Sequence, residues 1–307
     1  MITKGLKTVT NAVGNSLSLM KTGEQRMREE LVRSTDLMSI VLKKLLVNNN
    51  IEDLINRMPK KMGDHGYDPW GYNPETAKIG LAVLKKIYDY YFRVESYGLE
   101  NIPKTGSGFV IANHSGQLPI DGTLIATAMA TNPNGPRAPR VMIERFFPTV
   151  PFVYSFLTQV GSIIGDPINC IKMLENDEII IVFPEGIRGS GKPYKLRYQL
   201  QYMGTGFVRI AVQTKSPIVP VGVVGCEETM PSMGSIDFLA RLLSIPYVPI
   251  APPFPLPAKV ILTFGEPIYL DGDIDDENEM IKKVEIVKDS INDLIQQGLQ
   301  KRGKRYF

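Results

Sequence analysis

Hydrophobic positions in the first quarter of the chain recur at helical spacing. One helix is expected at 22–47, and the apolar positions that predict it are Met27, Leu31, Leu37, Ile40, Val41, Leu45 and Leu46. Shorter helical patterns follow at 51–58 and 75–92, on either side of a loop at 59–75 that is rich in Gly and Pro. The first helices are either a hairpin packed on the rest of the chain or interfacial helices at a membrane.

After residue 92 the pattern changes to short apolar runs that are typical of strands. These runs lie at 93–97, 107–113, 140–143, 178–183, 217–224 and 259–264. Helical stretches lie between several of them, and strands that alternate with helices form a mainly parallel sheet. The continuous apolar run 179–182 is expected to be buried on both faces. The predicted fold class is α/β, with a mainly parallel central sheet flanked by helices.

Two further patterns occupy the C-terminal part. Residues 236–258 are apolar but contain six prolines, so they cannot form one long helix and are either a buried cover or a membrane-facing patch. An amphipathic helix is expected at 276–299, capped by Asp275 or Asp276 and followed by a basic tail. The predicted division is an N-terminal helical segment and loop at 1–75, a central domain at 76–270, and a C-terminal helix with a basic tail at 271–307.

Composition excludes several classes of protein. The 307 residues include only two histidines, His65 and His114, so a multi-histidine metal site is excluded. Cys170 and Cys226 are far apart and are expected to be reduced thiols of a cytosolic protein. A net charge of +3 is too small for general nucleic-acid binding. The chain lacks a long uninterrupted apolar run and a leader-like N-terminus, so neither a transmembrane helix nor a secretory signal is expected.

The residues that carry chemistry follow predicted strands, at the edge where open α/β sheets bind ligands. His114 follows the run at 107–113, and Asp121 stands seven residues later at the start of a helical run. A carboxylate bonded to a histidine fixes its tautomer and stabilises the protonated ring. The spacing alone also fits a buried structural histidine and an aspartate that caps a helix.

A second group surrounds the segment F-P-E-G-I-R-G-S-G-K at 183–192, where Glu185 lies at a strand exit. The basic residues near it are Arg188, Lys192, Lys195 and Arg197. They form either a cluster suited to a phosphate or a solvated loop. The segment also matches the start of a phosphate-binding P-loop, but Pro193 stands where the magnesium-binding Ser or Thr belongs, so an NTPase is disfavoured. Arg145 follows another predicted strand and by itself fits a surface arginine.

Taken in order, these segments resemble the blocks of the glycerolipid acyltransferase family typified by bacterial 1-acylglycerol-3-phosphate acyltransferase. The matching blocks are N-H-S-G…D at 113–121, Arg145 before an aromatic residue, F-P-E-G-I-R-G-S at 183–190, P-I-V-P-V at 217–221 and the closing element F-G-E-P-I at 264–268. The resemblance covers roughly 95–270 and identifies the central domain as an acyltransferase domain.

Two departures from the usual blocks matter. Six residues separate His114 from Asp121 where four are common, and this longer form resembles monoacylglycerol- and diacylglycerol-type acyltransferases. The third block reads Ile187-Arg188-Gly189 where Thr-Arg-Ser is usual. The first departure leaves the identity of the acceptor open.

The resemblance implies a transfer of a fatty acyl group from coenzyme A or acyl-carrier protein to a hydroxyl of a glycerolipid. It makes His114 the general base, oriented by Asp121. The acceptor-binding residues that it implies are Arg145, Glu185, Gly186 and Arg188. Backbone N–H groups around Ser115–Gly116 are candidates for the oxyanion hole. No metal or cofactor is expected besides the thioester co-substrate.

Lysophosphatidate is the favoured acceptor because of Arg145, Arg188 and the basic cluster at 192–197, with a monoacylglycerol or diacylglycerol as the alternative. A thioester hydrolase using the same histidine and aspartate is the rival from another class; a non-catalytic membrane-binding protein is disfavoured by the presence of His114. Fatty substrates imply work at the cytoplasmic surface of a membrane without a spanning helix, in phospholipid or neutral-lipid synthesis. The N-terminal helices, the 236–258 segment and the basic tail are the expected contacts, although a solvated terminus is equally compatible with the tail.

Overall fold

The computed structural model describes residues 40–115, 118–145, 153–236, 238 and 248–303, and the chain divides into two compact units at 1–47 and 48–307. In the first unit, residues 40–46 are helical, and the remainder of the helix predicted at 22–47 lies outside the described residues. The boundary differs from the one predicted after residue 75. The second unit contains the sheet.

Three consecutive helical segments begin the second unit. In α2 (Asn49–Arg57) the side chain of Asn48 accepts a hydrogen bond from the N–H of Ile51 at 3.0 Å and so caps the helix. In α3 (Pro74–Lys86) Asn73 caps the first turn in the same way. This helix continues directly into the π-helix η1 (Ile87–Tyr91).

The loop between α2 and α3 is attached to the sheet by a buried ion-pair network. Arg140, at the start of a strand, is fully buried and pairs with Asp68 of the loop and with Glu178. Lys60 also pairs with Glu178, at 3.0 Å. Removing one partner from a buried pair leaves an uncompensated charge, so this network holds the loop in place. Residues 48–75 therefore belong structurally with the sheet.

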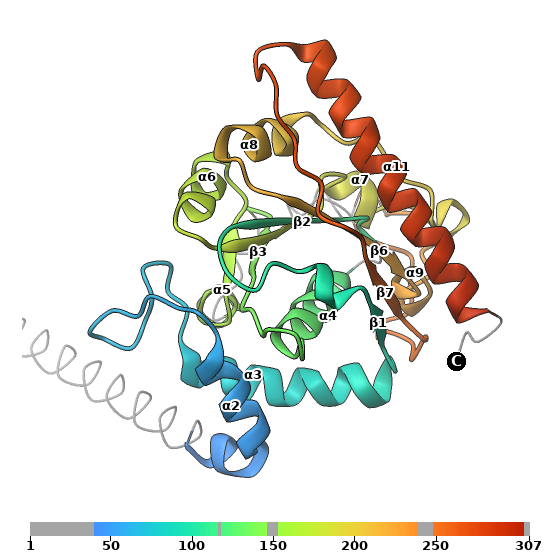
Figure 1. The fold of residues 1–307 in the computed structure, drawn as a ribbon. Coiled ribbons are helices and arrows are strands. Elements are labelled where there is room, and N and C mark those ends of the chain that lie inside the picture. The colour runs from blue at the N-terminus through green and yellow to red at the C-terminus, as the bar shows by residue number, and fades with distance from the viewer. Residues whose placement is uncertain (1–39, 116–117, 146–152, 237, 239–247, 304–307) are drawn as a thin grey trace, which may run out of the picture. The chain divides into compact units, whose positions relative to one another are not determined.

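In the part of the chain that the structure describes, seven strands form one mostly parallel sheet, as the sequence predicts (Figure 1). They are β1 (Glu95–Tyr97), β2 (Gly108–Ala112), β3 (Arg140–Ile143), β4 (Ser162–Ile164), β5 (Ile179–Val182), β6 (Ile218–Val224) and β7 (Ile261–Phe264). The order across the sheet is β1-β7-β6-β2-β5-β3-β4. Only the β6–β7 pair is antiparallel, so β1 and β7 run against the other five. Six strands match predicted runs, and β4 was not predicted.

Helices cover both faces of the sheet. Their bounds are α4 (Ile120–Ala130), α5 (Val153–Gln159), α6 (Pro167–Glu175), α7 (Ile187–Ser190), α8 (Gly206–Thr214), α9 (Cys226–Thr229) and α11 (Glu277–Arg302), with short 3-10 turns η2 (Leu99–Asn101) and η4 (Tyr194–Leu196). On β2, Phe109 and Ile111 pack toward α6, α8 and α11, whereas Val110 and Ala112 pack toward α4 and η1. This alternation buries the strand on both faces.

The C-terminal helix α11 lies along β6 and β7 (Figure 1). The side chain of Asp276 accepts from the N–H of Glu279 at 3.1 Å and so caps the helix, as predicted. Gly222 lets the helix approach closely, because a Cβ there would lie 2.6 Å from the backbone of Leu294.

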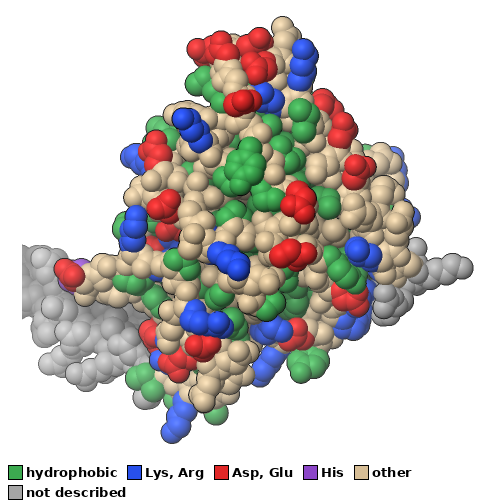
Figure 2. All heavy atoms as spheres, in the orientation of Figure 1, with side chains coloured by type: hydrophobic (Ala, Val, Ile, Leu, Met, Phe, Trp, Pro, Cys, Tyr) green, Lys and Arg blue, Asp and Glu red, His purple; other side chains and the backbone are tan. Residues whose placement is uncertain are grey.

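None of the helices that the structure describes is long and apolar enough to cross a membrane. Figure 2 shows acidic and basic side chains interspersed on one face, with an acidic group where α11 begins.

Candidate active site

The loop that leaves β2 is fixed to its neighbour β6 by a buried asparagine. The Nδ2 of Asn113 donates to the carbonyl oxygen of Val223 at 3.0 Å, and its Oδ1 accepts from the N–H of Val223 at 2.7 Å. These two bonds extend the hydrogen bonding between β2 and β6 beyond the end of the strand. The next residue, His114, therefore leaves the sheet at a defined place on its carboxyl edge.

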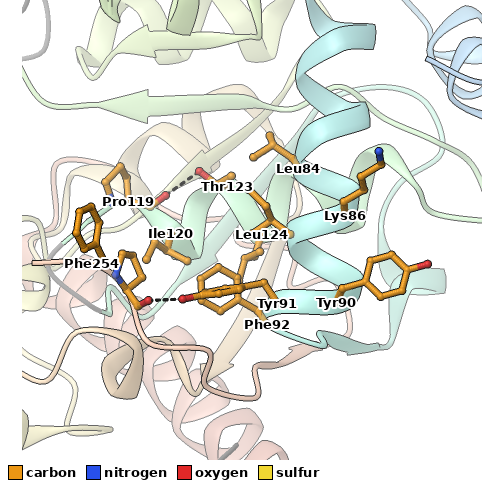
Figure 3. Close-up of a pocket in the computed structure, with 12 residues that line it drawn as sticks. Leu84, Lys86, Tyr90, Tyr91, Phe92, Pro119, Ile120, Thr123, Leu124 and Phe254 are labelled. Carbon is orange, nitrogen blue, oxygen red and sulfur yellow. Dashed lines mark hydrogen bonds between the residues drawn. The ribbon is translucent and has the colours of Figure 1, made fainter. Parts of the chain in front are cut away.

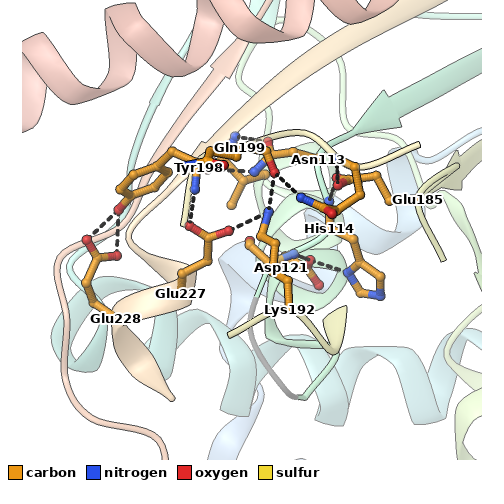
Figure 4. A network of polar contacts seen from close by, with 12 residues as sticks. Asn113, His114, Asp121, Glu185, Lys192, Tyr198, Gln199, Glu227 and Glu228 are labelled. Atoms are coloured by element: carbon orange, nitrogen blue, oxygen red, sulfur yellow. Dashed lines mark hydrogen bonds and ion pairs between the residues drawn. The ribbon is translucent and has the colours of Figure 1, made fainter. Parts of the chain in front are cut away.

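His114 and Asp121 are in direct contact (Figure 4). The distance from His114 Nδ1 to Asp121 Oδ2 is 2.7 Å, the histidine side chain is 13% exposed, and the aspartate is fully buried. Asp121 also accepts hydrogen bonds from the N–H groups of Ser115 and Gly122, at 2.8 and 2.7 Å. An ionised carboxylate only accepts, so Nδ1 carries the proton and Nε2 of the neutral ring is free to take one.

The surroundings make His114 a stronger base than a free histidine. Burial lowers the pKa of His114, but the charge of Asp121 and the hydrogen bond to it outweigh burial, with further contributions from Glu185 and Glu144. The pKa is therefore raised above its ordinary value of 6.5. The ring also stacks on Phe183 with 4.4 Å between centroids, which fixes its orientation.

The Glu185 carboxylate fixes the backbone of His114 by a hydrogen bond. Its Oε1 accepts from the backbone N–H of His114 at 2.8 Å, and its Oε2 accepts from the N–H of Gln201 at 2.6 Å. The side chain is buried, so the structure gives it a structural position where the sequence predicted contact with the acceptor. Gly189 permits this arrangement, because a Cβ there would lie 2.7 Å from the Cβ atoms of both His114 and Glu185.

A cavity of about 540 Å³ opens beside the histidine. Its wall includes His114 and Phe183, Glu144 and Arg145 at the end of β3, and Gly186. Gly186 has φ +53°, a left-handed conformation that glycine adopts without strain. The Arg145 side chain is 79% exposed and lies 3.4 Å from Asp166. The predicted residues His114, Arg145 and Gly186 are thus brought to one cavity.

The predicted phosphate cluster does not assemble at this cavity. Lys192 is buried, pairs with Glu227 at 2.7 Å and donates to a backbone carbonyl, because its side chain turns into the protein (Figure 4). Arg188 is exposed and lies over the ring of Tyr202, at 5.2 Å. Lys195 and Arg197 are exposed as well. None of these four residues is among the described residues that line the cavity.

Two residues that line the cavity had no predicted role of their own. Glu144 stands between a predicted strand and Arg145, and Phe183 is the first residue of the F-P-E-G segment. The Ser115 N–H, predicted as an oxyanion donor, donates its hydrogen bond to Asp121. Position 116, the other candidate, lies outside the described residues. Within the described ranges, no group of three His, Cys, Asp or Glu side chains is arranged to hold a metal ion.

A second and larger cavity, of about 700 Å³, is almost entirely apolar (Figure 3). Its walls come from α3 and η1, from the start of α4, and from the segment 254–255. The Tyr91 hydroxyl donates to the carbonyl of Pro255 at 2.6 Å and connects two of these walls. Pro119 and Ile120 line the cavity immediately before Asp121, so it adjoins the histidine loop.

The chain is similar to one family model, to several known proteins and to a solved structure. The model of the family described as Acyltransferase matches residues 93–224. An uncharacterized protein of Mycobacterium tuberculosis is 34% identical over 260 residues, covering 80% of this chain and 73% of that protein. The Bos taurus protein named "DGAT1/2-independent enzyme synthesizing storage lipids" is 27% identical over 207 residues, covering 66% and 58%. The crystal structure of the 1-acyl-sn-glycerophosphate acyltransferase of Thermotoga maritima has a TM-score of 0.47 and 24% identity, covering 71% of this chain and 81% of that one.

The fold and the site define an α/β enzyme of acyl transfer. The chain belongs to the acyltransferase family. Membership of an acyltransferase family, which the sequence blocks predicted, is thereby confirmed.

Proposed function

We propose that the protein transfers a fatty acyl group from an acyl thioester to a hydroxyl of a glycerolipid, with His114 as the general base. The observation that carries the proposal is the 2.7 Å contact between His114 Nδ1 and the buried Asp121, beside a cavity at the carboxyl edge of the sheet. Membership of the acyltransferase family supports the reaction class. The name of the bovine relative, which refers to storage lipids, supports a glycerolipid as the acceptor.

The geometry leads to a direct transfer. The acceptor hydroxyl binds in the 540 Å³ cavity, and Nε2 of His114 takes its proton while the oxygen attacks the thioester carbonyl. Asp121 stabilises the resulting imidazolium. When the tetrahedral intermediate collapses, the carbon–sulfur bond breaks and the imidazolium returns its proton to the leaving thiolate. The products are the new ester and the free thiol of coenzyme A or of the carrier protein, without a covalent acyl-enzyme.

The apolar cavity of Figure 3 is proposed to hold the fatty chain. Burial of each methylene group contributes about 0.8 kcal/mol, so an apolar cavity of this size favours a long chain over a short one. Tyr90 and Phe254 belong to its wall and are 79% and 77% exposed. Exposed aromatic side chains beside an apolar opening are suited to contact with lipid, so we place this opening at the membrane surface.

The test measures thiol release by the purified full-length chain with long-chain acyl-CoA. Lysophosphatidate, a monoacylglycerol, a diacylglycerol or no acceptor is supplied, and the acylated product is identified by mass spectrometry. Release is expected to rise when an acceptor is added and to be lost in His114→Ala. His65→Ala is the matched control, because His65 lies on an exposed loop. Equal release with and without every acceptor would overturn the proposal in favour of a thioester hydrolase.

A further inference from the structure

The charges on the wall of the His114 cavity are few. Of the described residues that line it, only His114, Glu144 and Arg145 have titratable side chains. The Arg145 guanidinium is largely exposed and forms a surface ion pair with Asp166 at 3.4 Å. Of the other basic residues predicted to recognise a phosphate, Arg188, Lys195 and Arg197 are not among the described residues that line the cavity, and Lys192 pairs with Glu227 in the interior.

Glu144 is the acidic residue of this wall. Its side chain is partly buried, and no hydrogen bond or ion pair joins it to another residue of the described part of the chain. It follows β3 directly, and β3 pairs with β5, so its position relative to the segment 183–186 is fixed by the sheet. Its charge contributes to the raised pKa of His114, which means that it acts at the place where the acceptor hydroxyl must react.

We infer that Glu144 is a specificity-determining residue that selects an uncharged glycerolipid acceptor and disfavours one that carries a phosphate. This inference rests on the proposed function and adds the chemical class of the acceptor. A phosphate monoester bound in the cavity would bring up to two negative charges close to this carboxylate, in a partly buried site where charges are screened less than in water. The hydroxyl of a monoacylglycerol or diacylglycerol meets no such repulsion.

The experiment compares two acceptors that differ in charge. The values of kcat/KM for lysophosphatidate and for a monoacylglycerol with the same acyl chain are measured in phosphatidylcholine vesicles, for the wild-type protein and for Glu144→Gln. Glu175→Gln is the matched control, because Glu175 is exposed at the end of α6 and does not line the cavity. Glu144→Ala, with thermal unfolding of all variants, separates a change of specificity from a change of folding.

The wild-type protein is expected to prefer the monoacylglycerol. Glu144→Gln and Glu144→Ala are expected to shift the ratio toward lysophosphatidate by at least about tenfold, which is the effect of removing one nearby like charge at a partly buried site. Glu175→Gln is expected to leave the ratio unchanged. A wild-type preference for lysophosphatidate, or an unchanged ratio in both Glu144 variants, overturns the inference while acyl transfer itself stands. Absence of transfer to either acceptor overturns the proposed function, and the inference with it.

Discussion

Replacement of Asp121 by asparagine tests the contact on which the site depends. The carboxylate accepts from His114 Nδ1 at 2.7 Å and from the N–H groups of Ser115 and Gly122 at 2.8 and 2.7 Å. Asparagine preserves the shape but removes the charge and replaces one accepting oxygen by a donating NH₂ group. At least one of the three donors then loses its acceptor, and the Nδ1 proton no longer has a charged acceptor.

The size and direction of the effect follow from these contacts. A hydrogen bond to a charged group contributes about 1.5–3 kcal/mol, so losing it from the protonated ring in the transition state lowers kcat/KM by between about tenfold and about a hundredfold. The charge of Asp121 raises the pKa of His114, so Asp121→Asn lowers that pKa. The unprotonated ring is the active form, and the acidic limb of the pH profile is therefore expected to move to lower pH.

The assay follows thiol release with a saturating acyl thioester across the pH range, for the wild-type protein, Asp121→Asn and Asp293→Asn. Asp293 lies on the exposed face of α11 and controls for the loss of a carboxylate elsewhere. For Asp121→Asn, we expect a lower plateau of the rate and an acidic limb displaced to lower pH than in the wild-type protein. An unchanged plateau, or a limb that stays in place or moves to higher pH, refutes it.

Three other substitutions probe the packing around the site. Ile120→Trp fills the apolar cavity and is expected to shorten the longest acyl chain that is used efficiently, as measured with a series of acyl-CoA lengths. Gly189→Ala places a Cβ 2.7 Å from the Cβ of His114, so it should lower kcat at least about tenfold through displacement of the base, with unfolding measured in parallel. Lys192→Met leaves the buried Glu227 without its cation and is expected to lower the free energy of unfolding by about 3–5 kcal/mol in denaturant titrations.

The sequence predicted most of the fold because the relevant signals are local. The apolar run at 140–143 coincides with β3 (Arg140–Ile143), and the predicted cap Asp276 starts α11. Strand β4 was missed because its three residues, Ser162–Ile164, are too few to show an alternating pattern. The attachment of the loop to the sheet could not be predicted, because the ion pair between Asp68 and Arg140 joins positions that are distant in the sequence.

The site was predicted only in part, because local sequence patterns indicate contacts between near neighbours in the sequence but not contacts between distant segments. His114 follows β2 and Asp121 lies seven residues later in the first turn of α4, so their contact can be anticipated from spacing. Glu144 reaches the cavity only because β5 lies between β2 and β3, an order that no local pattern contains. Lys192 shows the opposite error, since neighbours in sequence suggested a phosphate cluster while its side chain turns inward to Glu227.

The central claim is that His114 takes the proton of the acceptor hydroxyl. The most direct measurement is the rate of formation of the acylated glycerolipid by the wild-type protein and by His114→Ala, with circular dichroism and thermal unfolding to verify that both are folded. Loss of a general base predicts a decrease of about a hundredfold to ten-thousandfold in His114→Ala, whereas His65→Ala keeps the wild-type rate. A folded His114→Ala protein whose rate lies within about tenfold of the wild type would contradict the account.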